Sequence, residues 1–132
     1  LLDGIDLKPI FEDKSQVERD LFFHFPIYLQ EYQGLQDGSR DPLFRTRPGS
    51  VVISGDWKLH EYFEDGELEL FNLIDDPSEE NNVAEQNPDK TQELRKKLME
   101  WRATTNAKVP SQSNPEYDAA FEQQKIKEKS LR

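Results

Sequence analysis

Two histidines are the side chains best suited to acid–base or substrate-binding chemistry, since the chain contains no cysteine. The lack of cysteine excludes disulfides, thiolate zinc sites and a cysteine nucleophile within these residues. His24 lies between two phenylalanines in a strand-like run, and Tyr28 follows four residues later. It could contact a substrate where the strand ends, or it could be a strand histidine bonded to a neighbouring group. His60, the other histidine, is expected at an exposed position of a strand face.

Three arginines, Arg40, Arg45 and Arg47, lie in a loop that also contains glycines and prolines. Guanidinium groups bind sulfate or carboxylate through paired hydrogen bonds, so an anion site is one interpretation of this loop. Loop arginines of an acidic protein are also commonly solvated or paired locally. The sequence leaves both interpretations open.

An acidic turn at 75–82 contains four carboxylates and two asparagines, and such oxygen ligands suit calcium or magnesium. The spacing does not match an EF-hand loop, and Pro77 with the asparagines is equally typical of a turn and a helix cap. The sequence also lacks Gly-x-Ser-x-Gly, His-Glu-x-x-His, a phosphate-binding glycine loop and a recognisable triad. We therefore expect no catalytic residue, no metal site and no cofactor in this chain.

Residue types predict four strands and one long helix. The strands are expected at 20–25, 50–54, 56–63 and 67–73, and the helix at 88–105. Asn87 and Pro88 are typical of a helix N-cap and first helical position. Leucines at helical spacing give the helix one apolar face, which would cover a sheet. The predicted fold class is α+β, with an antiparallel sheet of about four strands packed against the helix.

A turn at Asp65-Gly66 is predicted to join the last two strands. Asp-Gly is typical of a type I′ turn, in which both central residues have positive φ. This turn would place Phe63 opposite Leu68. The apolar face of the hairpin would contain Trp57, Leu59, Phe63, Leu68 and Leu70. The other face carries apolar as well as polar residues, so we expect it to need a cover too.

Composition predicts a folded acidic domain. The 132 residues suit one domain, and an aromatic share of 11% is too high for a disordered chain. The formal charge of −10 is spread along the chain without a Lys/Arg block, which argues against nucleic acid and anionic membranes as partners. No apolar run is long enough to span a bilayer.

Six short motifs follow one another in a fixed order along the chain. They are 3–9 (DGIDLKP), 21–28 (LFFHFPIY), 55–59 (GDWKL), 69–73 (ELFNL), 76–79 (DPSE) and 82–84 (NVA). Together they resemble the C-terminal subdomain of the formylglycine-dependent sulfatases, the arylsulfatase family. The resemblance implies a segment leaving the catalytic domain at 1–13, the α+β subdomain at 14–106, and a linker with a peripheral tail or helix at 107–132.

The family resemblance also implies a function for the chain. It would pack on an N-terminal catalytic sulfatase domain that carries the formylglycine and the calcium, whose motifs are absent here. It would close one side of the pocket for a sulfated substrate, an aryl sulfate or a sulfated glycan, and would not be catalytic alone. His24 is then the best candidate for substrate contact, with Tyr28 and Arg47 behind it. The family further suggests an exported enzyme. An arginine that often precedes the GDWKL motif is missing at 52–54.

Two other functions remain open. The chain could be a free-standing binding or interaction module that retains the subdomain fold, or a carbohydrate-binding module that uses Trp57 or Tyr28 for stacking, although Trp57 suits a core position better. A missing catalytic partner predicts an exposed apolar patch, whereas a free module should be polar outside. The patch would comprise Leu1, Leu2, Ile5, Leu7, Ile10, Phe11 and the second face of the sheet.

Overall fold

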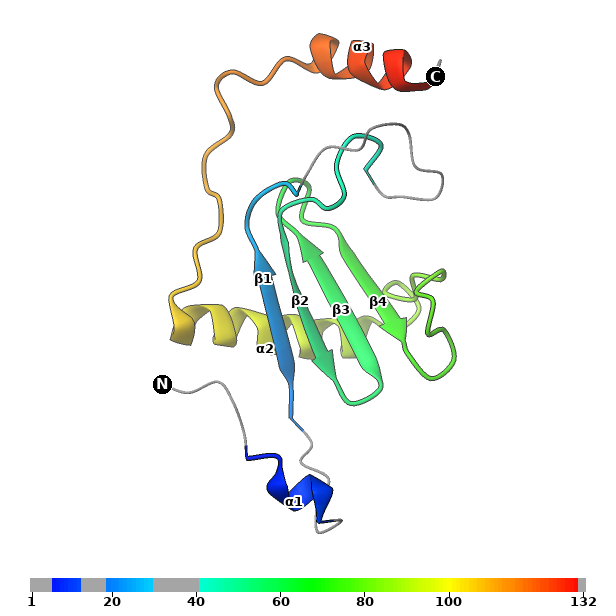
Figure 1. Cartoon of the computed structure of the whole chain (residues 1–132), viewed down its shortest axis with the longest axis vertical. Helices are drawn as coiled ribbons and strands as arrows, with labels where there is room; N and C mark the ends of the chain where they lie inside the picture. The colour runs from blue at the N-terminus through cyan, green and yellow to red at the C-terminus, as the bar shows by residue number, and fades with distance from the viewer. Residues whose placement is uncertain (1–5, 13–18, 30–40, 131–132) are drawn as a thin grey trace.

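The computed structural model describes residues 6–12, 19–29 and 41–130. Its elements are α1 (Lys8–Phe11), β1 (Leu21–Phe25), β2 (Gly49–Ser54), β3 (Trp57–Tyr62), β4 (Leu68–Asn72), α2 (Pro88–Thr105) and α3 (Ala119–Ser130). The four strands form one antiparallel sheet in the order β1-β2-β3-β4, and α2 runs across one face of it (Figure 1). The predicted α+β fold is thereby confirmed. The division of the chain at residues 13 and 106 stays a prediction.

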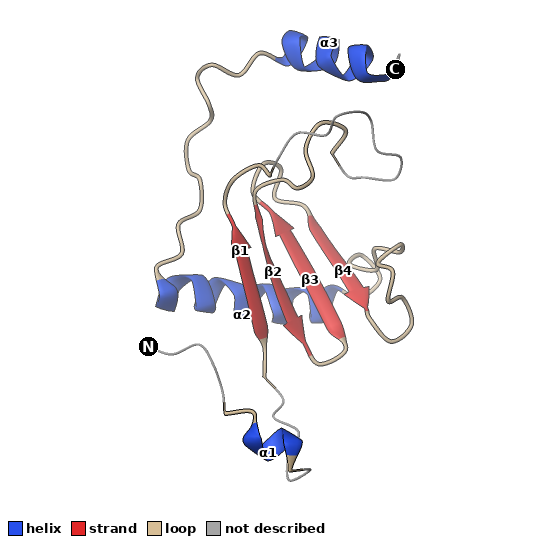
Figure 2. Cartoon of the chain, viewed as in Figure 1, coloured by secondary structure: helices blue, strands red, loops and turns tan. Residues whose placement is uncertain are grey.

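The core lies between the sheet and α2, which crosses one face of the four strands (Figure 2). Val52, Leu59 and Leu70 are cross-strand neighbours on the face toward the helix, and all three are 0% exposed. Leu94 and Leu98 of α2 pack against them and are equally buried. Fully burying one such side chain contributes about 1.5–3 kcal/mol. Trp57 packs at the margin of this cluster, which confirms its predicted core position.

The β3–β4 loop differs from the predicted type I′ turn. Leu59 pairs with Leu70 on the apolar face, and the Tyr62 N–H still donates to the Glu67 carbonyl just before β4, so four residues, 63–66, form the loop. Only Gly66 has positive φ in this loop, at 72°, while Asp65 Oδ1 accepts a hydrogen bond from the Glu67 N–H. Phe63 therefore does not face Leu68. Its N–H donates to the Pro48 carbonyl, which extends β3 alongside β2 instead.

The β3–β4 half of the second sheet face is covered by the acidic turn. Glu79 binds Lys58 on β3 with contacts of 2.6 and 2.7 Å, and Phe71 beneath the turn is only 5% exposed. The His60 side chain is 20% exposed and packs edge-on against Phe71. The expectation that His60 is exposed was wrong, because Glu79 and the turn fold over it.

Asn82 fixes the end of this turn on the free edge of β4. Its side chain accepts a hydrogen bond from the Leu70 N–H and donates one to the Leu68 carbonyl. Asn87 and Pro88 occupy the predicted N-cap and first helical positions. The Asn87 side chain makes no capping bond, however, because its amide donates to the Val83 carbonyl.

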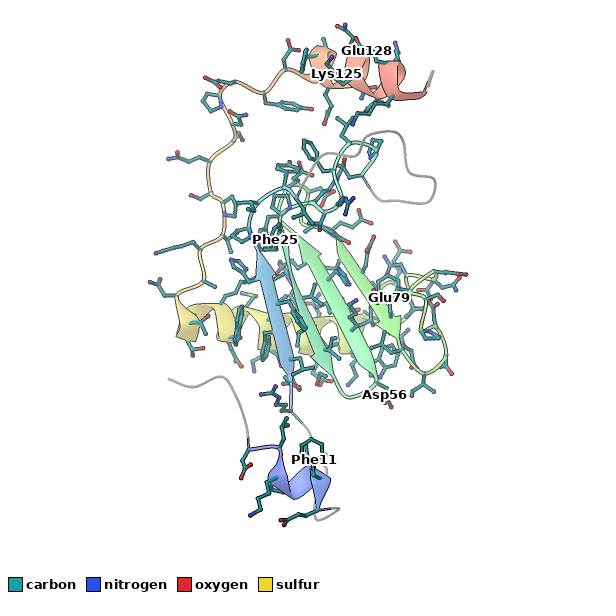
Figure 3. All side chains as sticks on the ribbon, viewed as in Figure 1. Phe11, Phe25, Asp56, Glu79, Lys125 and Glu128 are labelled. Atoms are coloured by element: carbon teal, nitrogen blue, oxygen red, sulfur yellow. The ribbon has the colours of Figure 1, made fainter. Side chains whose placement is uncertain are left out.

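No segment among the described residues covers the β1–β2 half of the second face, which leaves this half bare. Phe23 and Phe25 are 55% and 39% exposed. Figure 3 shows Phe25 at the end of β1 and Glu79 beside β4, toward the two opposite edges of the sheet. The predicted exposed patch is thus present at this face and at Leu7, Ile10 and Phe11 around α1. Its other members, Leu1, Leu2 and Ile5, lie outside the described residues.

Candidate functional site

His24 lies on the helix side of β1, and both of its ring nitrogens are engaged. Nδ1 is 2.7 Å from Ser50 Oγ, and Nε2 is 2.9 Å from the Lys108 carbonyl oxygen. A carbonyl only accepts, so Nε2 donates; in the neutral ring Nδ1 then accepts from the Ser50 hydroxyl. The rings of Phe63 and Trp101 flank the imidazole at 5.7 and 6.2 Å. His24 therefore ties β1 to the C-terminal end of α2.

The Ser50–His24 pair has the spacing of a nucleophile and its base, but it lacks access to substrate and an orienting carboxylate. Ser50 is only 1% exposed, so its hydroxyl is out of reach of a substrate. The second imidazole nitrogen binds the Lys108 carbonyl, where a triad would place an orienting carboxylate. The geometry makes this pair a structural hydrogen bond.

Tyr28 and Arg47, which sequence analysis grouped with His24, meet at Glu64 in the β3–β4 loop. The Tyr28 hydroxyl donates to Glu64, and Arg47 Nη1 is 3.2 Å from the same carboxylate. Arg47 also contacts Asp41 at 2.8 Å and Asp65 at 3.6 Å. The three surrounding carboxylates offset the positive charge that Arg47 would otherwise offer to a sulfate group.

Asp41 organises the loop that carries Arg47. One carboxylate oxygen accepts the N–H groups of Leu43 and Phe44, and the other accepts Arg47 Nε. Burial acts to raise the pKa of Asp41, but these hydrogen bonds outweigh it and hold the pKa below its usual value. Glu64 behaves in the opposite way, since burial and the nearby charges of Asp65 and Glu122 raise its pKa.

Beneath α2, Glu61 forms a buried ion cluster with two arginines. The Glu61 side chain is 9% exposed, and Arg102 and Arg95 approach its two oxygens to 2.5 and 3.2 Å. The Arg102 guanidinium also stands over the Phe63 ring, 5.5 Å from its centroid. This cluster fixes the end of α2 and the base of the β3–β4 loop, which in turn carries Glu64.

Three of the four carboxylates of the acidic turn, those of Asp75, Asp76 and Glu79, form bonds within the fold. Asp76 accepts the backbone N–H groups of Asn81 and Glu80 at 2.8 and 3.1 Å, and these bonds lower its pKa. Lys58 binds both oxygens of Glu79. Among the described residues, no three or more His, Cys, Asp or Glu side chains are grouped to hold a metal ion. Within the same residues, every helix is too short or too polar to cross a bilayer.

A shallow groove lies on the second face of the sheet and crosses β1, β2 and β3. Its walls and floor come from Phe23, Phe25, Gly49, Val51, His60 and Tyr62, and Thr46 and Arg47 stand at one end. Gly49 lies directly between Phe25 and Tyr62 in the strand register. A Cβ at this position would be only 2.8 Å from the Glu61 carbonyl oxygen. The groove therefore depends on glycine at this point.

Sequence reasoning missed Asp41, Glu64 and Ser50 as partners of the candidate site residues. Asp41 has a local signal, because Asp followed by Pro is typical of a side chain that turns back onto its own backbone. Glu64 contacts Arg47 because of loop length, and Ser50 contacts His24 because of strand register. No local sequence pattern predicts contacts of this kind.

Comparison with known proteins supports the sulfatase resemblance. No family model matches the chain. A protein named "Sulfatase" from Formosa agariphila is 29% identical over 119 residues, which cover 80% of this chain and 19% of that protein. The chain thus spans about a fifth of the length of its curated relative.

Solved structures share the fold. A putative sulfatase from Bacteroides thetaiotaomicron superposes with a TM-score of 0.62 at 21% identity, over 86% of this chain and 23% of the other. A protein solved with its substrate D-glucosamine-2-N,6-O-disulfate gives a TM-score of 0.56 at 19% identity, over 84% of this chain and 22% of the other. In each case the match covers most of this chain and a small part of the solved protein.

Proposed function

The chain is a sulfatase homologue over a region that makes up about a fifth of such a protein, and we propose that it is the non-catalytic C-terminal subdomain of a sulfate-ester hydrolase. In this role it stabilises the catalytic part and closes one side of the substrate pocket. The observation that carries the proposal is the bare apolar half of the sheet, where Phe23 and Phe25 are 55% and 39% exposed. Apolar surface of this kind is typical of a face that is covered by a partner.

The chemistry of the hydrolysis is assigned to the catalytic part. Two carboxylates of the acidic turn are already engaged, because Lys58 holds both Glu79 oxygens and backbone N–H groups hold Asp76, and the residues that the structure describes group no other set of ligands for a metal ion. We therefore propose that calcium and the formylglycine belong to the catalytic part, and that this chain alone releases no sulfate. The substrate is a sulfate ester, either an aryl sulfate or a sulfated sugar. The solved relative bound to a disulfated glucosamine favours a sulfated sugar.

The loop end of the sheet is the proposed substrate side. His24, Tyr28 and Arg47 lie there, next to the β3–β4 loop at 63–66. Each of these side chains must give up a bond within the chain before it can bind a substrate. His24 would give up its bond to the Lys108 carbonyl, and Tyr28 and Arg47 would give up their bonds to Glu64. We propose that His24 contacts the sugar or aryl portion of the substrate. Because three carboxylates neutralise the charge of Arg47, we propose that Arg47 lines the pocket without binding the sulfate group.

The test is sulfate release by a complete enzyme that contains this chain, with His24→Ala compared with wild type. The matched control is Ser50→Ala, which removes one partner of His24 but not the imidazole. Both variants lose internal bonds of His24 and should lower the melting temperature. Substrate contact predicts, in addition, that His24→Ala loses about tenfold or more in kcat/KM relative to Ser50→Ala, equivalent to one good hydrogen bond in the transition state. Unchanged kcat/KM with a lowered melting temperature in His24→Ala would leave His24 only its structural role.

The rival function is a free-standing interaction module with the same fold. It predicts a chain that is monomeric and soluble at high concentration and binds no separate catalytic part. The exposed aromatic rings on β1 favour the subdomain over this rival.

A further inference from the structure

The groove on the open sheet face has the form of a socket for one side chain. Phe25 on β1, Gly49 on β2 and Tyr62 on β3 are directly opposite one another in the strand register. Neighbouring strands are about 4.8 Å apart, so the backbones of the two aromatic residues are about 10 Å apart, and Gly49 puts no side chain between them. The Tyr62 ring leans toward this space, since a Cβ on Gly49 would lie 3.6 Å from its Cδ1 atom. Val51 continues the floor along β2, and Thr46 stands at the other end.

We propose that the catalytic part of the sulfatase inserts one apolar side chain into this socket, and that the open sheet face rather than α2 is the surface docked on it. The inference rests on the proposed function and adds to it the docking face and the chemistry of the contact. An aromatic or a branched aliphatic side chain has the chemistry to pack against the Phe25 and Tyr62 rings that line the groove.

The socket suits an apolar group because most of the polar groups that line it are already paired. Tyr62 donates its hydroxyl to Glu69, Arg47 binds Asp41, and Thr46 donates to the Arg47 carbonyl. The exception is His60 Nε2, which is buried without a hydrogen-bond partner among the described residues. The surface left exposed comes mainly from the Phe23 and Phe25 rings. An entering group would therefore find apolar contacts in the socket and few free hydrogen-bonding partners.

The outer surface of α2 has the opposite character. Ion pairs Lys90–Glu93 and Lys96–Glu100 run along it, with side chains 34% to 77% exposed. A helix surface covered by such pairs is typical of contact with water. The apolar face of the same helix is already filled by the sheet. Of the two layers, the sheet therefore offers the docking surface.

The occupant is assigned to the catalytic part because of the size of the relatives. This chain covers 19% of its curated relative and 22–23% of the solved proteins that share its fold. About four fifths of each of those proteins thus lies outside the matched region and is available to cover the bare half of this sheet. A second copy of this chain is the competing occupant.

Single cysteine variants test the docking face, since the chain has no cysteine of its own. Phe23→Cys and Phe25→Cys report on the socket, and Met99→Cys, at a residue 53% exposed on α2, is the matched control. The rate of alkylation at each site is followed by peptide mass mapping, in the isolated chain and in the complete enzyme. We expect both socket cysteines to react at least roughly tenfold more slowly in the complete enzyme, and the control to react equally in both.

Equal alkylation of the socket cysteines in both contexts would overturn the proposal. If the socket cysteines of the isolated chain reacted more slowly as its concentration rose, the proposal would also be overturned. The socket would then be filled by a second copy of this chain. Failure of sulfate release by the complete enzyme would instead count against the proposed function. The two failures are therefore distinguishable.

A photo-crosslinking residue at Thr46, on the rim of the socket, identifies the occupant directly. In the complete enzyme we expect the crosslink to join an apolar residue of the catalytic part or its immediate neighbour. A crosslink within this chain, or between two copies of it, would contradict the proposal.

Discussion

The contact of Glu79 with Lys58 is expected to hold the acidic turn on the sheet in spite of an unfavourable backbone. Glu79 has φ of 58°, in the left-handed region, which costs a residue other than glycine about 1–2 kcal/mol. Lys58 Nζ is 2.6 and 2.7 Å from its two oxygens, and the two side chains are 18% and 30% exposed. We assign this partly buried pair about 2 kcal/mol, between the values for exposed pairs and for charged hydrogen bonds.

Two substitutions at this position separate the ion pair from the backbone. Glu79→Ala loses the pair and keeps the left-handed strain, so it should reduce the free energy of unfolding by about 2 kcal/mol. Glu79→Gly loses the same pair but relieves the strain, so it should cost only about 1 kcal/mol. Urea unfolding of the isolated chain measures both, and for 132 residues a difference of 1 kcal/mol corresponds to about 4 °C in melting temperature.

Glu80→Ala, at the exposed neighbouring residue, is the control and should change stability by less than about 0.5 kcal/mol. A double-mutant cycle of Lys58→Met with Glu79→Gln measures the pair itself. If Glu79→Gly were as unstable as Glu79→Ala, the strain would not exist. A coupling energy below about 0.3 kcal/mol would show that the pair contributes nothing.

Three further predictions concern the sheet and its buried charges. Gly49→Ala should cost about 1–3 kcal/mol in thermal unfolding, because its Cβ would meet a backbone oxygen at 2.8 Å; an unchanged melting temperature would refute that contact. Glu61→Leu should cost about 3 kcal/mol by leaving Arg102 buried without its partner, and adding Arg102→Leu should restore most of the loss; a double variant as unstable as the single one would argue against the ion pair. Burial and the Lys58 charge lower the pKa of His60, so folding disfavours its protonation. Stability should therefore fall as pH drops below about 6.5 and level off below the folded pKa, and His60→Gln should remove this component of the urea-unfolding profile; an identical profile in the variant would refute it.

Elements with a strong local pattern were predictable from the sequence. Strand composition and helical periodicity located β1 to β4 and α2 to within one or two residues. The common face of Leu59 and Leu70 followed from alternation alone. The sulfatase resemblance, which rests on six short motifs, is confirmed by the relative that is 29% identical.

Long-range contacts were not predictable in the same way. The β3–β4 loop has four residues because Phe63 continues to pair with β2, and its neighbour there, Pro48, is distant in sequence. His60 was expected to be exposed, but a turn that begins more than ten residues later folds over it. The partners of His24, at Ser50 and Lys108, depend on register and on where α2 ends.

The most direct measurement is sulfate release from 4-nitrophenyl sulfate and from a sulfated glucosamine, by the isolated chain and by the complete enzyme that contains it. A non-catalytic subdomain predicts no release by the isolated chain at any concentration, and turnover by the complete enzyme. Release by the isolated chain, or a complete enzyme that cleaves no sulfate ester, would contradict this account.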